Sequence, residues 1–244
     1  METYERAGLD GTIETWDASV SATSTGPTIA RTREGINVRY GFDASIRHMP
    51  VATAERPLAV SIDVAAILAH DDVDRHYPPS RNVYVCDAGP VLVRVTNVTM
   101  AQRARELMSR MMRPDDIAKR MDGSSLRNLT GETVSLYGQD GMLELPAEDG
   151  VDVRTRVRMR RELPPVGNVP ALMGSLNGVA SLPDETDGVV LVVRPHIAML
   201  APQRRDLCVA CTDGNLAVTR RAAADVTRDE IPATTNRQPT TMPA

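Results

Sequence analysis

Histidine and carboxylate side chains are concentrated in the stretch HDDVDRHYPP, which covers residues 70–79. It contains His70, Asp72, Asp74 and His76. Imidazole and carboxylate groups together suit a divalent metal ion, and a metal-activated water molecule is a common route to hydrolysis. The alternative is a solvated helix end that enters a Pro-Pro loop, because proline does not continue a helix. We expect the loop, and therefore no bound metal and no other cofactor.

Two cysteines have the spacing of half a zinc site. Cys208 and Cys211 form a C-x-x-C pair, and Cys86 is the third cysteine of the chain. A structural zinc ion usually takes four ligands. On a strand, positions 208 and 211 face opposite sides of the sheet, because successive side chains alternate. We expect two buried small side chains here, with zinc binding or redox chemistry as the alternative.

Arginines crowd the sequence RTRVRMRR at residues 154–161. In a strand, Arg154, Arg156, Arg158 and Arg160 share one face, and the side chains between them, including that of Met159, face the core. Cations in a row repel one another unless something negative faces them. The row has three interpretations, namely a phosphate site with bidentate arginine contacts, a docking site for an acidic protein subunit, or a solvated face. In the last interpretation the arginines pair with acidic residues of the same chain, such as Glu144, Glu148 and Asp149.

The overall charge gives no support for nucleic acid as a partner. Acidic residues number 32 and basic residues 28, which gives a formal net charge of −4 and no global attraction to a polyanion. The sequence also lacks the phosphate-binding patterns G-x-x-x-x-G-K-[ST] and G-x-G-x-x-G and the G-x-S-x-G elbow of many hydrolases. We therefore expect a protein without enzymatic activity.

The elements that position these residues are mainly β-strands. Short apolar runs with alternating polar residues, separated by Asp-Gly and similar turns, are typical of hairpins. The strand-forming stretches are residues 11–24, 28–42, 82–98, 130–138, 141–146, 151–161, 169–175, 188–193 and 206–221.

Helical signals are fewer. Residues 57–70 begin as a strand and continue as a helix, Thr99 opens a capping box, and Pro114 starts a short helix in the favoured way. A further short helix begins at Pro195. The sequence predicts a mainly β fold with a minor helical layer (α+β), in which two β-rich units are joined by a helical segment. The expected divisions are a β-rich unit at 1–98, a helical segment at 99–127, a β-rich unit at 128–221 and an extended polar arm at 222–244.

The second expected unit contains several short motifs. They are Asn128-Leu129-Thr130, Asp140-Gly141, Leu145-Pro146, Leu182-Pro183, Asp187-Gly188, Val192-Val193 and Arg205-Asp206-Leu207. On these motifs, residues 128–221 resemble a family of short uncharacterised proteins encoded by bacteriophages and prophages of GC-rich bacteria, which open with an NLTPH-like strand. This chain departs from that pattern at Gly131-Glu132, which replaces the proline-histidine pair.

The resemblance implies a viral origin, not a reaction. Together with the arginine row, it leads us to expect a virus-encoded, non-enzymatic interaction protein, an accessory structural component of a virion, that forms homo- or hetero-oligomers with other viral subunits. One alternative is a phage anti-defence protein that sequesters a host nucleotide signal through Arg156, Arg158 and their neighbours. A second is a metal-dependent hydrolase centred on His70 to His76.

The expected location is the virion or the host-cell cytoplasm. The N-terminus has no apolar signal region, and no apolar run approaches the roughly 20 residues that a membrane-spanning helix needs. We therefore expect neither secretion through a signal peptide nor contact with a membrane.

Overall fold

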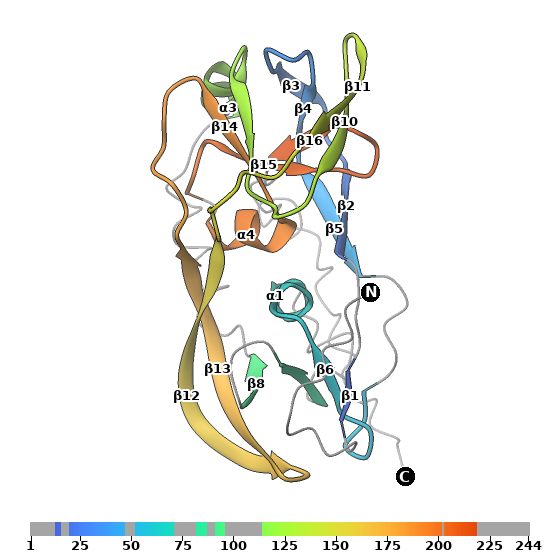
Figure 1. Cartoon of the computed structure of the whole chain (residues 1–244), viewed down its shortest axis with the longest axis vertical. Coiled ribbons are helices and arrows are strands. Elements are labelled where there is room, and N and C mark those ends of the chain that lie inside the picture. The colour runs from blue at the N-terminus through green and yellow to red at the C-terminus, as the bar shows by residue number, and fades with distance from the viewer. Residues whose placement is uncertain are drawn as a thin grey trace, which may run out of the picture.

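The computed structural model describes residues 13–15, 20–46, 52–70, 82–86, 91–95, 114–201 and 203–218. Within these ranges the chain is mainly β-structure with a few short helices, which confirms the expected fold class (Figure 1). The strands are β1 (Glu14–Thr15), β2 (Val20–Ser24), β3 (Thr28–Arg31), β4 (Asn37–Tyr40), β5 (Phe42–Ile46), β6 (Leu58–Val60), β7 (Val83–Val85), β8 (Leu92–Val95), β9 (Ser125–Asn128), β10 (Val134–Gly138), β11 (Gly141–Leu145), β12 (Arg154–Val166), β13 (Val169–Ala180), β14 (Val189–Val193), β15 (Leu207–Ala210) and β16 (Leu216–Val218). The helices are α1 (Ile62–His70), α3 (Pro114–Met121) and α4 (Pro195–Leu200).

Two six-stranded sheets share one topology. The lower sheet of Figure 1 has the order β1-β6-β7-β8-β13-β12, and the upper sheet has the order β9-β14-β15-β16-β4-β3. From the first strand to the last, successive pairs are parallel, parallel, antiparallel, parallel and antiparallel in both sheets. The elements β1–β8 and β9–β16 are therefore two halves built on one plan.

Each sheet contains a β-α-β unit, because a parallel pair of strands needs a crossover between them. In the lower sheet the unit is β6-α1-β7, and in the upper sheet it is β14-α4-β15. Helix α1 starts at the Ser61 hydroxyl, which accepts a hydrogen bond from the Val64 amide at 3.5 Å. Helix α4 starts at Pro195, whose fixed φ suits the first helical position. The two helices contact each other between the sheets (Figure 1).

The two halves exchange hairpins. The chain leaves the lower sheet after β1, forms the long hairpin of β2, β3, β4 and β5, and inserts β4 beside β16, with Val38 opposite Leu216. In the same way, the chain leaves the upper sheet after β9 and inserts β13 beside β8, with Ala171 opposite Leu92. Figure 1 shows the β12–β13 hairpin running the length of the lower part of the molecule. Each sheet is thus completed by the other half.

This exchange corrects the expected division into separate units at 1–98 and 128–221. Both sheets combine strands from the two ranges, because the outer hairpins reach the edge of the opposite sheet. In the expected helical segment 99–127, α3 is present at Pro114–Met121, and residues 99–113 lie outside the described residues. The expected polar arm at 222–244 also lies outside them.

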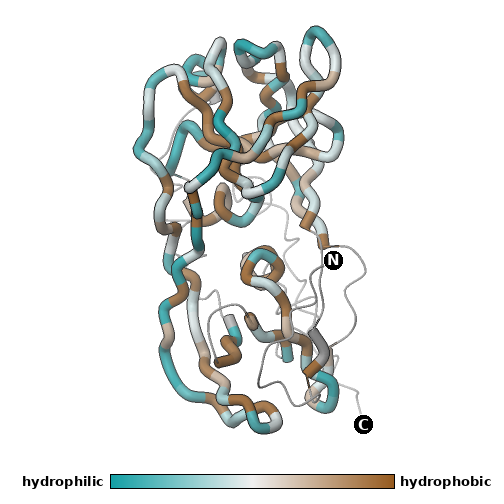
Figure 2. The backbone as a smooth tube through the Cα atoms, in the orientation of Figure 1, coloured by the Kyte–Doolittle hydropathy of each residue, from teal (hydrophilic) through white to brown (hydrophobic). Residues whose placement is uncertain are grey.

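The upper sheet has an apolar cluster on each face. On one face, Leu191 and Val193 pack with Ile197 of α4. On the other, Val190 and Val192 pack with residues of α3 and of the β10–β11 hairpin. This alternation follows from the period of two along a strand, and Figure 2 shows hydrophobic positions concentrated along the central strands of this sheet. A strand that is buried on both faces reads as an unbroken apolar run.

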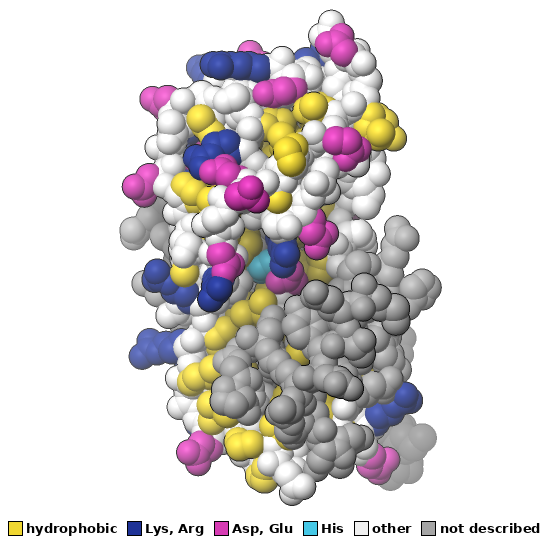
Figure 3. Space-filling view, viewed as in Figure 1, with side chains coloured by type: hydrophobic (Ala, Val, Ile, Leu, Met, Phe, Trp, Pro, Cys, Tyr) yellow, Lys and Arg dark blue, Asp and Glu magenta, His cyan; other side chains and the backbone are white. Residues whose placement is uncertain are grey.

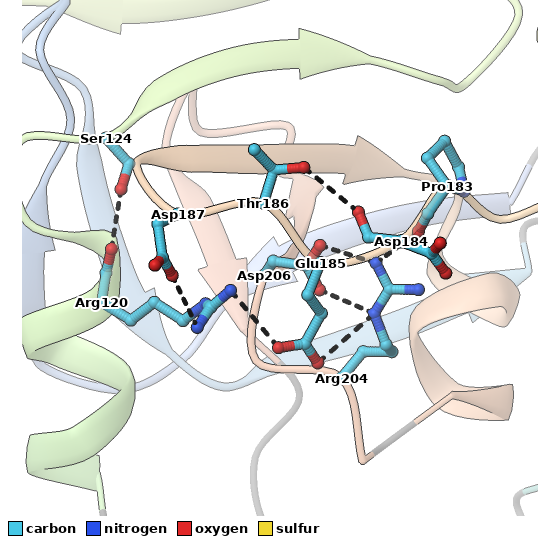
Figure 4. Close-up of polar contacts among 9 residues, drawn as sticks. All are labelled: Arg120, Ser124, Pro183, Asp184, Glu185, Thr186, Asp187, Arg204 and Asp206. Carbon is cyan, nitrogen blue, oxygen red and sulfur yellow. Dashed lines mark hydrogen bonds and ion pairs between the residues drawn. The ribbon is translucent and has the colours of Figure 1, made fainter.

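An ion-pair network fixes the link before β14 to the entry of β15 (Figure 4). The Arg204 guanidinium donates to both oxygens of the buried Asp206 carboxylate, at 2.9 and 2.7 Å, and to the Pro183 carbonyl at 2.7 Å. Glu185 lies between two cations, 3.5 Å from Arg204 and 3.3 Å from Arg120. The charges of this network are paired, so it is a structural clamp.

Candidate interaction surface

Strand β12 is an edge strand, since it ends the order of the lower sheet. Arg154, Arg156, Arg158 and Arg160 are exposed along it. The alternation with half-buried neighbours runs from Arg154 to Arg158. In this first part of the strand the arginines therefore lie on one face, as the spacing predicts. Figure 3 shows basic side chains along the side of the molecule that the β12–β13 hairpin occupies.

The second part of the row departs from simple alternation. The pairing of β12 with β13 shifts register between Thr155 and Val157, between Met159 and Arg161, and again before Val166. A bulge places an extra residue in one strand and turns the following side chains. Met159, which we expected to face the core, lies before the second shift and is 41% exposed. This expectation is wrong, because alternation places a side chain on one face of a strand and does not show whether other residues cover that face.

The four arginines differ in their partners. Arg154 pairs with the Asp152 carboxylate, and its hydrogen bond lowers the pKa of that carboxyl group. Arg160 donates from Nε to the Ser175 hydroxyl at 3.1 Å. Arg156 and Arg158, in contrast, have neither an ion pair nor a side-chain hydrogen bond within the part of the chain that the structure describes. Two adjacent cations on one strand face thus lack a counter-charge among the described residues.

The acidic residues that we considered as partners do not neutralise the row. Glu148 forms a two-point contact with Arg127 instead, at 2.8 and 2.5 Å, and the hydrogen bond from Arg127 lowers the pKa of Glu148. Glu144 and Asp149 make no ion pair among the described residues. The interpretation of a face neutralised by its own chain therefore holds for Arg154 through Asp152, and not for the pair Arg156 and Arg158.

Features of β12 act against the addition of a further strand. Exposed edge strands are protected in natural proteins by charged side chains, proline and bulges, and β12 has arginines, register shifts and Pro164-Pro165. A partner on this surface is therefore met by side chains rather than by backbone pairing.

A charged cluster joins the two halves where α1 meets α4. The Asp63 carboxylate lies 3.0 Å from Arg194 Nη1 and 3.3 Å from His196 Nε2. Arg194 also donates from Nε to the Thr130 carbonyl at 2.7 Å. The His196 side chain is only 4% exposed, and burial lowers its pKa to about 4, so the imidazole is neutral at neutral pH. Sequence reasoning missed this cluster, because Asp63 and Arg194 are 131 positions apart.

Most of the residues that we considered as metal ligands are not among those that the structure describes. The His70 side chain and residues 71–81, which include Asp72, Asp74 and His76, lie outside the described residues. Among the residues that are described, no group of three or more His, Cys, Asp or Glu side chains is arranged to hold a metal ion.

Two of the three cysteines are core residues of the upper sheet. Cys208 and Cys211 belong to the apolar clusters on opposite faces of the upper sheet. Burial raises the pKa of both thiols, that of Cys211 to about 12. Cys86 approaches the Val60 carbonyl at 3.4 Å. Thiolates, the reactive and metal-binding form, are therefore disfavoured at Cys208 and Cys211.

The Asn-Leu-Thr motif also has a structural explanation. The buried Asn128 side chain donates to the carbonyls of Glu132 and Leu145, at 2.7 and 2.8 Å, and accepts from the Thr130 amide and hydroxyl, at 3.0 and 2.7 Å. It thereby ties β9 to the loop and to β11. Gly131 has φ +83°, a conformation that the fixed φ of proline excludes. The departure from the NLTPH-like pattern at this position is consistent with the local backbone.

No protein-family model, curated protein or solved structure shows a significant match to the chain. The described residues include no helix that is long and apolar enough to cross a membrane.

Proposed function

We propose that this chain is a virus-encoded, non-enzymatic interaction protein, an accessory structural component of a virion, which docks an acidic surface of another viral subunit. The observation that carries this proposal is the pair Arg156 and Arg158. Both side chains are exposed on the same face of β12, and neither has a counter-charge among the described residues.

The chemistry of the pair supports a protein partner. Arginine is enriched at protein interfaces, because its planar guanidinium forms two-point contacts with carboxylates and is less strongly hydrated than an ammonium group. Met159, the next residue along β12, is also exposed. The long β12–β13 hairpin is held along its length by antiparallel pairing and by β8, so the surface is presented on an ordered support. The viral assignment is supported by the resemblance of residues 128–221.

Mass spectrometry of purified particles tests this function. Particles of the encoding virus are prepared with the wild-type chain, with R156E/R158E and with K119E/R205E. The last variant makes the same charge change at exposed residues away from β12. We expect the wild type and the K119E/R205E variant in particles and strong depletion of R156E/R158E. Absence of the wild-type chain from particles contradicts the proposal.

The nucleotide-binding alternative is separated by a thermal-shift screen with cyclic nucleotides and ADP-ribose derivatives. A ligand present at 100 times its dissociation constant stabilises the folded protein by about 2.7 kcal/mol. We expect no such stabilisation. A clear shift that R156E/R158E abolishes overturns the assignment of the arginines to a protein partner.

A further inference from the structure

A second surface, on the β10–β11 hairpin, combines exposed apolar side chains with acidic ones. Tyr137 is 60% exposed and Met142 is 63% exposed. The two residues are direct cross-strand partners, so their side chains lie side by side on one face of the hairpin. The opposite face is buried through Leu136, which is fully covered, and Leu143. The two neighbouring apolar side chains are therefore available for contact with another protein.

This apolar pair has an acidic rim. Glu144 lies on the same face as Met142, two positions along β11. Asp140 is at the hairpin turn. Asp140 and Glu144 are exposed and make no ion pair within the described part of the chain. We call Tyr137, Met142 and these two acids the acidic hairpin surface.

The support of the acidic hairpin surface is ordered. The Tyr137 amide donates to the Gly214 carbonyl at 2.8 Å, and the tyrosine ring covers Gly214 so closely that a Cβ there would lie 1.8 Å from a ring carbon. The hairpin is therefore fixed to the turn between β15 and β16. Among the described residues of the first half, no corresponding hairpin lies between β1 and β2.

The two surfaces are complementary and lie on different parts of the molecule. The arginine row offers Arg156 and Arg158 with the exposed Met159, and the acidic hairpin surface offers unpaired carboxylates around Tyr137 and Met142. Figure 1 places the β10–β11 hairpin at the upper right and β12 at the lower left. In Figure 3, apolar and acidic side chains accompany the former and basic side chains the latter. One copy can therefore offer both surfaces at once.

We propose that the partner of the arginine row is a second copy of this chain, and that the row docks on the acidic hairpin surface of that copy. This inference rests on the proposed function, since it names the partner of the same surface. The contact is heterologous, because it joins two different surfaces. Repetition of such a contact produces a closed ring or an open filament, and charge complementarity selects the head-to-tail orientation over contacts between like surfaces.

Sedimentation velocity of the full chain over a range of concentrations tests the self-contact. We expect species larger than a monomer that dissociate as salt is raised, because salt screens exposed charges. R156E/R158E and D140R/E144R are each expected to raise the apparent dissociation constant at least about tenfold, and K119E/R205E to leave it unchanged. A wild-type chain that stays monomeric at all concentrations overturns the inference, as does assembly that is insensitive to both reversals.

Mixing the two reversed variants gives a sharper result. R156E/R158E keeps an intact acidic hairpin surface, and D140R/E144R keeps an intact arginine row. Their mixture is expected to recover the assembly that each variant loses alone, because the two intact surfaces pair with each other and the two reversed surfaces, acidic on β12 and basic on the hairpin, pair as well. A chain with all four substitutions is expected to recover assembly through exchanged charges. Failure of both the mixture and the fourfold variant, with all chains folded by circular dichroism, overturns the pairing of these surfaces.

The proposed function and this inference fail in different ways. A chain that is present in particles and depends on Arg156 and Arg158, but does not self-associate, supports the function and refutes the self-contact. A chain that assembles with itself and is absent from particles supports the self-contact and refutes the function.

Discussion

The two exchanged hairpins occupy equivalent places and carry different outer strands. The inner strands β4 and β13 each complete the opposite sheet by parallel pairing. The outer strands differ, because β2 has the sequence VSATS and β3 has TIAR, whereas β12 begins RTRVRMRR. Inner strands are constrained by the sheet they enter, and outer strands are free to vary. This difference indicates that the arginine row is not a requirement of the topology.

The largest expected effect tests the constraint on the inner strand. Val38 of β4 is fully buried in the upper sheet, so V38D places a charge without a partner in an apolar core. We expect a loss of stability of more than about 4 kcal/mol, measured by urea denaturation. R156D introduces the same residue on the outer strand, and we expect it to change stability by less than about 0.5 kcal/mol. Equal losses in the two variants contradict the distinction between the strands.

The next effect is a pH dependence of the unfolding free energy, caused by His196 in the charged cluster where α1 meets α4. The folded state keeps His196 neutral down to about pH 4, whereas its ordinary pKa is 6.5. The unfolded chain therefore binds more protons between these values, and the stability present above pH 6.5 is lost as the pH falls toward 4. At about 1.4 kcal/mol per pH unit, the loss is about 3 kcal/mol.

Denaturation curves of the wild type and H196Q between pH 4 and 7 measure this dependence. Glutamine does not take up a proton in this pH range. The contribution of His196 to the slope of unfolding free energy against pH is therefore expected to disappear in H196Q. An identical slope in the two proteins contradicts the assignment of the dependence to this side chain.

A smaller effect is expected at the clamp before β15. Asp206 precedes β15, and Asn82 precedes β7 at the equivalent place in the first half. D206N introduces the residue of the first half and removes the charge that receives two hydrogen bonds from Arg204. We expect destabilisation of about 2 kcal/mol, within the range for hydrogen bonds to charged groups, by chemical denaturation. No loss of stability means that the clamp is dispensable in the second half.

The smallest effect on stability is expected for R156A/R158A. The two side chains have no ion pair among the described residues, so their removal is expected to change the unfolding free energy by less than about 0.5 kcal/mol. Assembly, measured by sedimentation, is expected to weaken. A large loss of stability instead indicates that the row has a structural role in the hairpin.

Much of the secondary structure follows from local sequence. The expected strands at 141–146 and 188–193 correspond to β11 at Gly141–Leu145 and β14 at Val189–Val193. The helix expected from Pro195 is α4. Turn residues and apolar runs determine these elements over a few positions, so no knowledge of distant contacts is needed.

Long-range features do not follow from local patterns. The hairpin exchange depends on which strands pair, and alternation carries no information about the partner strand. The contact of Asp63 with His196 depends on the approach of two helices from different halves. The exposure of Met159 depends on which residues cover its face of β12, and Tyr137 and Met142 occur in a strand pattern that leaves open which face is covered.

Site-specific photo-crosslinking in virus-producing cells tests the central claim most directly. A photoreactive amino acid replaces Met159 beside the arginine pair in one chain, and Thr23, which is exposed on the outer strand of the other hairpin, in a second chain. We predict a crosslinked protein partner at position 159 and none at position 23. Equal crosslinking at both positions, or none at position 159, contradicts the claim that β12 is the docking surface.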